Sequence, residues 1–518
     1  MKVKELAREK RESYLKYLSK RSPEAYREYK SVRNRVNSNI RRIKKEHWEA
    51  FTADIERDLY GAQKKVWGLL RRRKKEVNEY VQTNTISIQD WENHFRKLYE
   101  NREDREAETL LPEVISTFIS IELVENAVKS LKNRKAAGYD EIPNELIKYG
   151  SEGLHHQLAL LSTIDAIFVV RQVVEKSIEF EKPAFMCFVD LTKAFDRVQL
   201  NDIIEILTAK NIPPEIIKII ETLNRNTSTY ILTNNIKSNE IQISSGIRQG
   251  DSLSPFLFNL IMEKIISEVK NAGRGYRTSK GEIKIICYAD DAVLISENED
   301  ELQKLLHQFY ITSSKLNMEI SVAKTKSLVI AKEPLRCKLA VNDKIIEQVM
   351  SFKYLGVEVS ACQNRKKENM QQINKAARVS GCLSDIIWKN KHMGQAAKIK
   401  IYKSCVRPIM TYAAETKAET SKTKANSRAA EMKTLRKIAG RTLQDRVPSA
   451  EIRNMLDVQD VVRWVRARRR AWNEHVSRMQ SDRIAKIARD GKPSNTRPPG
   501  RPPKRWIECW TSTSQEAN

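Results

Sequence analysis

The sequence predicts an α+β or α/β protein in which a strand-bearing middle section lies between helical, basic segments. Two short β-prone runs, residues 184–190 and 283–290, each end in an aspartate. Helical stretches such as residues 202–222 separate these runs, so strands and helices alternate through the middle of the chain. Outside this section, apolar residues recur at the three-to-four spacing of one helix face, which predicts helices.

A long basic helix is predicted near the N-terminus. Ser22 followed by Pro23 is typical of an N-cap with proline at the first helical position. One face of this helix carries an apolar stripe, formed by Tyr29, Val32, Val36, Ile40, Ile43, His47, Phe51 and Ile55. The remaining faces are rich in Arg and Lys. They are either the solvated faces of a support helix or a surface that contacts phosphates, and the sequence leaves both interpretations open.

The chain has 518 residues and is strongly basic, with 93 Lys and Arg against 66 Asp and Glu, a net charge of +27. Such an excess predicts a polyanionic partner, most often nucleic acid. The charge is densest in the flanks: residues 1–110 hold 28 basic and 19 acidic side chains, and residues 451–505 hold 15 and 6. No apolar run approaches the roughly 18 residues of a membrane span. We therefore expect an intracellular protein, nuclear and cytoplasmic, that is not secreted and has no membrane partner.

The seven cysteines form no C-x-x-C pair, which weighs against a structural zinc site and against a secreted disulfide framework. Walker A, G-x-G-x-x-G and H-E-x-x-H patterns are absent from the sequence. Several common classes of nucleotide-binding and metalloprotease enzymes are thereby excluded.

Three aspartates are candidates for a metal-dependent site. Asp290 and Asp291 lie between two apolar runs, which predicts a tight hairpin with both carboxylates at its tip. Asp190 ends a third apolar run, 100 residues upstream. Three clustered carboxylates raise one another's pKa values unless a cation lies among them. Two Mg²⁺ ions about 4 Å apart in such a cluster suit phosphoryl or nucleotidyl transfer. Taken alone, however, an Asp-Asp pair is more often a plain turn.

A third segment, Gly246–Pro255, has two glycines four residues apart, followed by an apolar run. Glycines at this spacing let a backbone approach a ligand closely. Taken alone, the segment is more typical of an ordinary junction between a loop and a helix.

The order of these segments strongly resembles motifs A, B and C of reverse transcriptases, at residues 188–196, 246–255 and 288–291. The resemblance is greatest to non-long-terminal-repeat retrotransposons, the endonuclease–reverse transcriptase polyproteins of the RTE and jockey groups. It extends to further motifs of the family. These are Lys135–Pro143 in the fingers, Ser162–Phe168 before motif A, Lys324–Lys326 as motif D, Phe352–Gly356 as the primer grip, and His475–Met479 and Gly500–Pro502 near the C-terminus.

This resemblance implies roles for individual residues. Asp190, Asp290 and Asp291 would be the catalytic residues and would bind two Mg²⁺ ions, with Mn²⁺ as an alternative. Phe195 would exclude a 2′-hydroxyl, with a core aromatic as the other interpretation. Gln249 and Gly250 would contact the incoming base pair and the template, and Lys324 would contact the triphosphate. The primer end would be held by Tyr354, Leu355 and Gly356. A β-hairpin packing role is the alternative for this last group.

The resemblance also implies a right-hand polymerase, whose palm is an antiparallel sheet with packed helices. The expected parts are a basic helical N-terminal extension at 1–110, truncated fingers at 111–183, a palm at 184–360, a helical thumb with C-terminal helices at 361–490 and a basic Pro-rich tail at 491–518. The implied activity is RNA-directed DNA polymerase, a nucleotidyltransferase. The implied partners are an RNA template, a DNA primer and deoxynucleoside triphosphates. The oligomeric state is not predicted.

The sequence departs from the family in the fingers, because only 25 positions separate Asp140 from Asp165. We expect basic residues that contact the triphosphate to be missing there, and no endonuclease domain to precede the chain. The alternative function is accordingly a catalytically defective retrotransposon remnant that only binds nucleic acid. The tail from residue 494 to 506 is expected to be extended rather than packed. It either lies in an AT-rich minor groove or binds phosphates without preference.

Overall fold

The computed structural model describes residues 2–57, 66–69, 87–99, 163–225, 227–233, 236–248, 251, 253–361, 365–500 and 504–511. The chain divides into two compact units. Unit 1 comprises residues 1–81, 365–414 and 419–469, and unit 2 comprises residues 82–364, 415–418 and 470–518. The five-part division proposed from the sequence stays a prediction. Its fingers motif Lys135–Pro143 and the junction at residues 161–162 lie outside the described residues.

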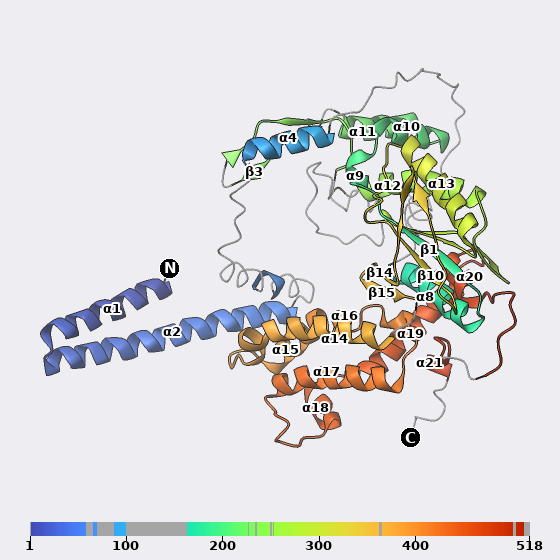
Figure 1. Ribbon diagram of the computed structural model, residues 1–518. Helices are drawn as coiled ribbons and strands as arrows, with labels where there is room; N and C mark the ends of the chain where they lie inside the picture. The colour runs from blue at the N-terminus through green and yellow to red at the C-terminus, as the bar shows by residue number, and fades with distance from the viewer. Residues whose placement is uncertain are drawn as a thin grey trace. The chain divides into compact units, whose positions relative to one another are not determined.

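Unit 1 is helical in its described part (Figure 1). Its helices are α1 Lys2–Lys20, α2 Pro23–Arg57, α14 Arg365–Cys382, α15 Gln395–Ile401, α16 Arg407–Met410, α17 Ser421–Ala439, α18 Ser449–Leu456 and the first part of α19 Val461–Arg478. Two π-helical segments, Ser384–Trp388 and Tyr402–Val406, and the start of a 3₁₀ turn, Ala414–Thr416, complete it.

The predicted basic helix near the N-terminus is confirmed as α2. Pro23 is its first residue, and the Ser22 hydroxyl accepts a hydrogen bond of 3.2 Å from the Ala25 backbone N–H, so Ser22 is the N-cap. Val36 and Ile55 of the predicted apolar stripe are fully buried. Ile55 joins the core of unit 1 with residues of α14 to α18, whereas α1 folds back along the N-terminal half of α2 (Figure 1).

Unit 2 is built around a five-stranded sheet with the strand order β13-β10-β1-β9-β8. Its strands are β1 Ala184–Val189, β8 Ile285–Tyr288, β9 Asp291–Ser296, β10 Lys326–Ile330 and β13 Glu347–Gln348. Neighbouring strands pair antiparallel, except for the short parallel pair of β10 and β13 at one edge. The predicted α+β class is therefore confirmed, with a mixed sheet in place of a purely antiparallel one.

Helices and two-stranded ribbons surround this sheet. The helices are α4 Ile88–Tyr99, α8 Thr163–Glu179, α9 Ala194–Arg197, α10 Leu200–Ala209, α11 Pro214–Asn224, α12 Ser254–Asn271, α13 Glu299–Lys315, α20 Ile484–Asp490 and α21 Glu508–Thr511. The ribbons are β2 Thr227–Thr229 with β5 Ile241–Ile243, β3 Leu232–Thr233 with β4 Ile236–Lys237, β6 Tyr276–Thr278 with β7 Gly281–Ile283, β11 Ala340–Val341 with β12 Lys344–Ile345, and β14 Ser351–Tyr354 with β15 Val357–Ser360.

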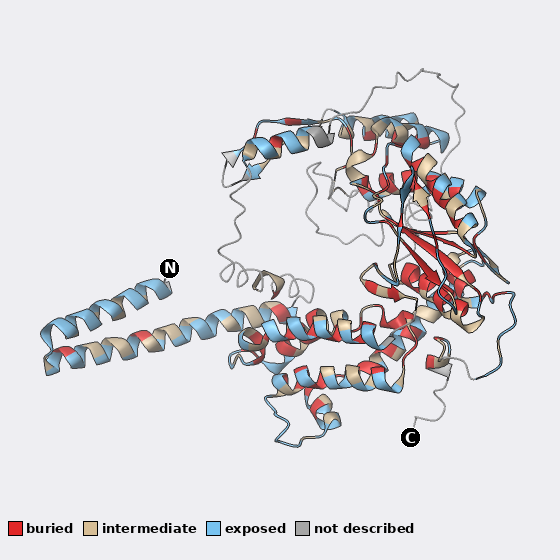
Figure 2. Cartoon of the chain, viewed as in Figure 1, coloured by how far each residue is buried: buried red, intermediate tan, exposed pale blue. Residues whose placement is uncertain are grey.

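Strand β1 is the central element of unit 2, and all six of its residues are buried (Figure 2). Because successive side chains of a strand point to opposite faces, β1 contributes to two cores. Phe185, Cys187 and Val189 belong to the cluster that includes α10, α12 and α13. Met186 and Phe188 belong to the cluster on the other face, with α8, β14 and α20. Burial on both faces explains why the sequence of β1 is a continuous apolar run rather than an alternating one.

The C-terminal segment is packed where the sequence predicts an extended tail. Trp506 is buried against Phe168 of α8 and Trp472 of α19, with ring centroids 4.7 and 5.6 Å away. Its indole N–H donates a 2.7 Å hydrogen bond to the Glu415 carbonyl. The expectation for residues 494–506 was wrong at this end. Burying a large aromatic ring stabilises the folded protein more than leaving that ring in a solvated tail.

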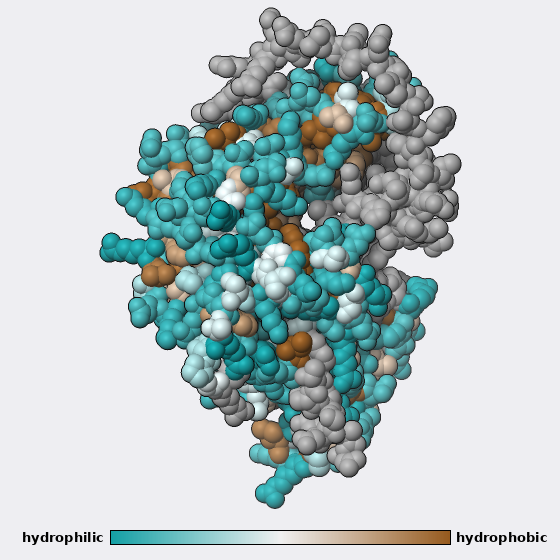
Figure 3. Space-filling model, turned by 90° about the vertical axis from the view of Figure 1, so that its right-hand side faces the viewer, coloured by the Kyte–Doolittle hydropathy of each residue, from teal (hydrophilic) through white to brown (hydrophobic). Residues whose placement is uncertain are grey.

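None of the helices in the described part of the chain is long and apolar enough to span a membrane. The face drawn in Figure 3 is mostly hydrophilic, with apolar side chains confined to small patches.

Candidate active site

Strand pairing brings the three predicted aspartates to one end of the sheet. In the β1–β9 pair, Val189 lies opposite Ala292. Continuing this antiparallel register by one residue places Asp190 opposite Asp291. In the β8–β9 hairpin, Tyr288 lies opposite Asp291, so Ala289 and Asp290 form a two-residue turn. The predicted strand and hairpin are thus confirmed, and residues 100 positions apart in the sequence meet at one sheet end.

The hairpin turn has an unusual backbone conformation. Ala289 has φ of 53°, in the left-handed region that glycine normally occupies. Holding a residue with a Cβ there costs on the order of 1 kcal/mol, and such strain tends to accumulate at functional sites. The strained residue directly precedes Asp290, so the conformation of the turn fixes the positions of the Asp290 and Asp291 carboxylates at the tip of the hairpin.

A second segment holds Asp190 through its backbone. The Asp190 N–H donates to Thr325 Oγ1 at 3.2 Å, and the Asp190 carbonyl accepts from the Ser321 N–H at 2.8 Å. Thr325 is fully buried. These contacts fix residues 321–325 against the end of β1 and bring the motif D lysine to the site. Thr325 lies within motif D, and the sequence alone predicts no role for it. No signal near Thr325 in the sequence indicates this contact.

Lys324 forms an ion pair with Asp190. Its Nζ lies 3.3 Å from Asp190 Oδ2. That oxygen is buried and accepts no hydrogen bond within the described part of the chain. The contact is therefore an ion pair without hydrogen-bond geometry, made by a lysine whose side chain is 71% exposed.

The electrostatics of the site show like charges close together. The pKa of Asp291 is raised, first by loss of contact with water around its carboxyl group and then by the charges of Asp290 and Asp190. The two other aspartates therefore lie near enough to repel the Asp291 carboxylate. A cation among them would relieve this repulsion.

The donor set fits divalent metal ions in its chemistry. Carboxylate oxygens are the ligands that Mg²⁺ prefers, and the Asp190 oxygen that accepts no hydrogen bond could bind a metal ion in place of Lys324. Within the described residues, however, no three Asp, Glu, His or Cys side chains lie close enough to form a metal site. The fold brings the carboxylates to one sheet end without gathering them into a coordination shell. Their roles as metal ligands stay predictions.

Phe195, predicted to face the sugar, lies five residues after Asp190 in the short helix α9. Its ring stacks on Phe258 of α12, with ring centroids 4.2 Å apart and an interplanar angle of 15°. Phe195 is half-buried at the edge of the core and Phe258 is fully buried. The inner side of the ring is therefore occupied by core packing, and its role toward a nucleotide stays a prediction.

The start of motif B packs directly on motif A. The Gly246 N–H donates to the Val198 carbonyl at 2.7 Å, and the Ile247 N–H donates to the Phe195 carbonyl at 2.9 Å. Gly246 has φ of 96°, and a Cβ at this position would lie 2.9 Å from the Asp196 carbonyl oxygen. Only glycine allows this approach. Gln249 and Gly250, the predicted nucleotide and template contacts, lie outside the described residues.

The predicted primer-grip residues form the β14–β15 hairpin. Leu355 and Gly356 have φ of 43° and 83° and make its two-residue turn. Tyr354 is buried, and its ring lies 5.6 Å from that of Phe188 in β1. Burial raises the pKa of the Tyr354 phenol, with smaller contributions from Cys287 and Asp291. The packing role weighed from the sequence holds for the tyrosine ring, and primer contact stays a prediction for the hairpin.

Comparison with known proteins agrees with these motifs. Residues 144–359 match the family model described as reverse transcriptase (RNA-dependent DNA polymerase). The chain carries a reverse transcriptase domain. All three aspartates, Phe195, Lys324 and the β14–β15 turn lie within the matched residues of this domain.

Two curated relatives are non-long-terminal-repeat retrotransposon proteins. The Pol polyprotein of the type-1 element R2 of Nasonia vitripennis is 28% identical over 187 residues, which cover 34% of this chain and 18% of the relative. The RNA-directed DNA polymerase of the mobile element jockey of Drosophila funebris is 26% identical over 275 residues, 51% of this chain and 29% of the relative. The chain thus spans less than a third of the length of these relatives.

Among solved structures, an apo telomerase from Candida tropicalis matches with a TM-score of 0.29 at 13% identity, covering 53% of this chain and 49% of that chain. The recognition of the reverse transcriptase domain comes from the family model and the retrotransposon relatives.

Proposed function

We propose that this chain is an RNA-directed DNA polymerase that extends a DNA primer along an RNA template with deoxynucleoside triphosphates. The observation that carries the proposal is the register that sets Asp190 opposite Asp291, beside Asp290, inside the reverse transcriptase domain. Carboxylates converging from a strand end and a hairpin tip are the arrangement that nucleotidyl transfer needs. The net charge of +27 suits a polyanionic template and primer.

Each residue has a defined task in this proposal. Two Mg²⁺ ions, or Mn²⁺, on the three aspartates would favour the ionised primer 3′-hydroxyl and neutralise charge on the triphosphate. Phe195, fixed by Phe258, forms a wall beside the sugar. Lys324 is long and exposed enough to turn from Asp190 to a phosphate of the bound nucleotide.

The test is primer extension by the purified full chain with an RNA template, a DNA primer, deoxynucleotides and Mg²⁺. We expect product from the wild type, and at least about a hundredfold less from Asp290→Asn, because the amide keeps the shape and removes the charge. Asp300→Asn is the matched control, since Asp300 is an exposed aspartate at the start of α13. It should extend the primer at the wild-type rate.

Binding is measured on the same variants with a labelled primer–template duplex. Asp290→Asn should bind it within about threefold of the wild type, since phosphate contacts come from basic residues elsewhere. Equal extension by the wild type and Asp290→Asn would contradict the site. A wild type that binds but never extends would contradict the polymerase and favour a protein that only binds nucleic acid.

A further inference from the structure

The bend between α1 and α2 carries a cluster of four tyrosines. Tyr14 and Tyr17 come from α1, and Tyr26 and Tyr29 come from α2. Ring centroids are 5.1 Å apart for Tyr14 and Tyr29 and 5.3 Å apart for Tyr17 and Tyr26. The rings of Tyr17 and Tyr29 are stacked at 6.2 Å with an interplanar angle of 10°. We call these four residues the tyrosine platform.

Closing the helical hairpin is one role of the platform, but it does not account for how much of it is exposed. Tyr14 and Tyr26 are 42% and 45% exposed, and the adjacent Leu15 and Leu18 are 53% and 43% exposed. Figure 2 shows α1 as exposed along most of its length. Apolar and aromatic surface therefore remains open to solvent at the bend. Rings that keep a free face are able to stack on another flat group.

The charge around the platform is basic. Residues 10–33 contain eight Lys and Arg against three Glu. The exposed cations Lys20, Arg21, Arg27 and Lys30 make no ion pair with any residue that the structure describes. Arg33 lies over the ring of Tyr29, 5.8 Å from its centroid. Unpaired cations among exposed aromatic rings match the two parts of a single-stranded nucleic acid, its phosphates and its unpaired bases.

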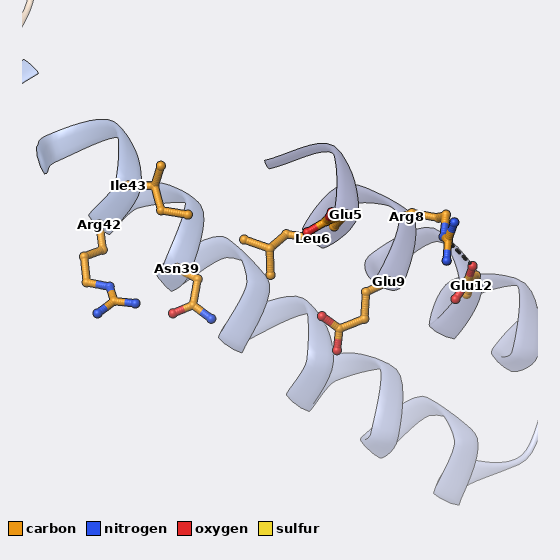
Figure 4. Close-up of a pocket in the computed structure, with 8 residues that line it drawn as sticks. All are labelled: Glu5, Leu6, Arg8, Glu9, Glu12, Asn39, Arg42 and Ile43. Atoms are coloured by element: carbon orange, nitrogen blue, oxygen red, sulfur yellow. Dashed lines mark ion pairs between the residues drawn. The ribbon is translucent and has the colours of Figure 1, made fainter. Parts of the chain in front are cut away.

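The other end of the same hairpin is different. A groove of about 520 Å³ between α1 and α2 is lined by Glu5, Glu9 and Glu12 as well as by Arg8 and Arg42 (Figure 4). Arg8 pairs with Glu12 at 3.1 Å, and Glu9 pairs with Arg35. Carboxylates with paired cations do not attract a polyanion. Within this hairpin, unpaired cations beside exposed aromatic rings are therefore found at the bend.

We propose that the tyrosine platform is a binding site for an unpaired polynucleotide strand. Tyr14 and Tyr26 stack on successive bases, and the lysines and arginines of residues 20–30 contact the phosphates. The site lies in unit 1, outside the reverse transcriptase domain, and it does not depend on polymerase activity.

The test is fluorescence anisotropy of the full-length protein with labelled oligouridylate and oligothymidylate of about 20 nucleotides. Tyr14→Ala/Tyr26→Ala should weaken binding to at least one of these strands by at least about tenfold, since stacking contributes about 1–3 kcal/mol per base. Tyr14→Phe/Tyr26→Phe keeps both rings and should bind like the wild type. A loss restricted to oligouridylate would identify RNA as the ligand, and an equal loss for both would identify any unpaired strand.

The dependence of affinity on salt concentration distinguishes the contribution of base stacking from that of phosphate contacts. Lys20→Gln/Arg21→Gln/Arg27→Gln removes three cations and should reduce the slope of log affinity against log salt by about 2, at about 0.7 per phosphate contact. Tyr14→Ala/Tyr26→Ala should leave this slope unchanged. Circular dichroism should show equal helix content for all variants, so that a loss of binding does not reflect a melted hairpin.

Two results would overturn the proposal. One is unchanged affinity of Tyr14→Ala/Tyr26→Ala for both strands, which would restrict the tyrosines to packing or to contact with a protein. The other is an equal loss for a long blunt duplex, because only its terminal pairs offer a free face to a ring. Extension of a short primer–template by Tyr14→Ala/Tyr26→Ala should continue at the wild-type rate, which keeps this test independent of the polymerase assay.

Discussion

The ammonium group of Lys324 lies 3.3 Å from Asp190 Oδ2, the carboxylate oxygen that accepts no hydrogen bond within the described residues. A lysine therefore stands where a metal ion would bind in the proposed polymerase. Because its side chain is 71% exposed, leaving this position costs little. The same lysine can thus compensate charge in the protein alone and contact phosphate once a nucleotide binds.

Replacing Lys324 should expose this competition. We expect Lys324→Gln to lower the stability of the metal-free protein by less than about 1 kcal/mol, since the lysine is mostly solvated. Mg²⁺ should then stabilise the variant more than it stabilises the wild type, because the competing cation is gone. Thermal unfolding during a Mg²⁺ titration measures both effects. Lys304→Gln, which removes an exposed lysine paired with Glu301 at 2.8 Å, should leave the response to Mg²⁺ unchanged. Identical responses of Lys324→Gln and the wild type would refute the competition.

The raised pKa of Asp291 makes stability depend on pH. Loss of water contact, then the charges of Asp290 and Asp190, lift its pKa above the ordinary 3.8. Between 3.8 and the raised pKa, the folded state binds more protons than the unfolded state, so stability falls as pH rises through this window.

Asp291→Asn removes this cost of ionisation. In metal-free buffer, its free energy of unfolding relative to the wild type should increase from about pH 4 to about pH 7, by less than about 1 kcal/mol for a partly solvated group. Urea unfolding at several pH values gives the difference. Saturating Mg²⁺ should abolish the advantage of the variant, because a bound cation stabilises the ionised aspartates. A difference that does not vary with pH would show that the carboxylates do not interact.

The parts of this site that follow from local sequence could be predicted. The apolar run before Asp190 and the two runs around Asp290 and Asp291 define a strand and a hairpin, since period and turn are local properties. The order of the motifs then indicated that these segments meet. The structure adds the strand register, which sets Asp190 opposite Asp291.

Other contacts could not be predicted, because they depend on packing between distant segments. Thr325 binds the backbone of Asp190 from 135 residues away, and nothing near Thr325 in the sequence marks that contact. Trp506 is buried beside Phe168, although a Pro-rich, basic surrounding predicts a solvated tail. In this case tertiary burial of one large ring outweighed the local composition.

Gly246 connects motifs A and B through a close backbone approach, which a methyl group would prevent. Gly246→Ala places a Cβ about 2.9 Å from the Asp196 carbonyl and imposes φ of 96° on a residue that disfavours it. We expect a loss of about 1–3 kcal/mol in stability and reduced primer extension, because α9 and Phe195 must shift. Gly394→Ala is the control, since no atom lies within 4 Å of its added Cβ. Thermal unfolding of both variants tests this role. Equal melting temperatures of the two variants would contradict it.

The C-terminal segment is held to α8 by a buried lysine. Lys176 Nζ donates hydrogen bonds to the carbonyls of Ala488, Arg489 and Gly491, at the end of α20. Burial lowers the pKa of Lys176 to about 8, against smaller opposing effects of nearby acids such as Glu175. Lys176→Met leaves three carbonyls without their donor and should destabilise unit 2 by about 2–4 kcal/mol.

Limited proteolysis distinguishes detachment of this segment from global unfolding. In Lys176→Met, cleavage should begin C-terminal to residue 484, since the carbonyls at the end of α20 lose their anchor before the sheet opens. Lys332→Met is the matched control, because Lys332 is 69% exposed and its only described ion pair is with Glu181 on the surface. It should unfold and be cleaved like the wild type. If Lys176→Met is as stable as Lys332→Met, the three hydrogen bonds do not hold the C-terminal segment.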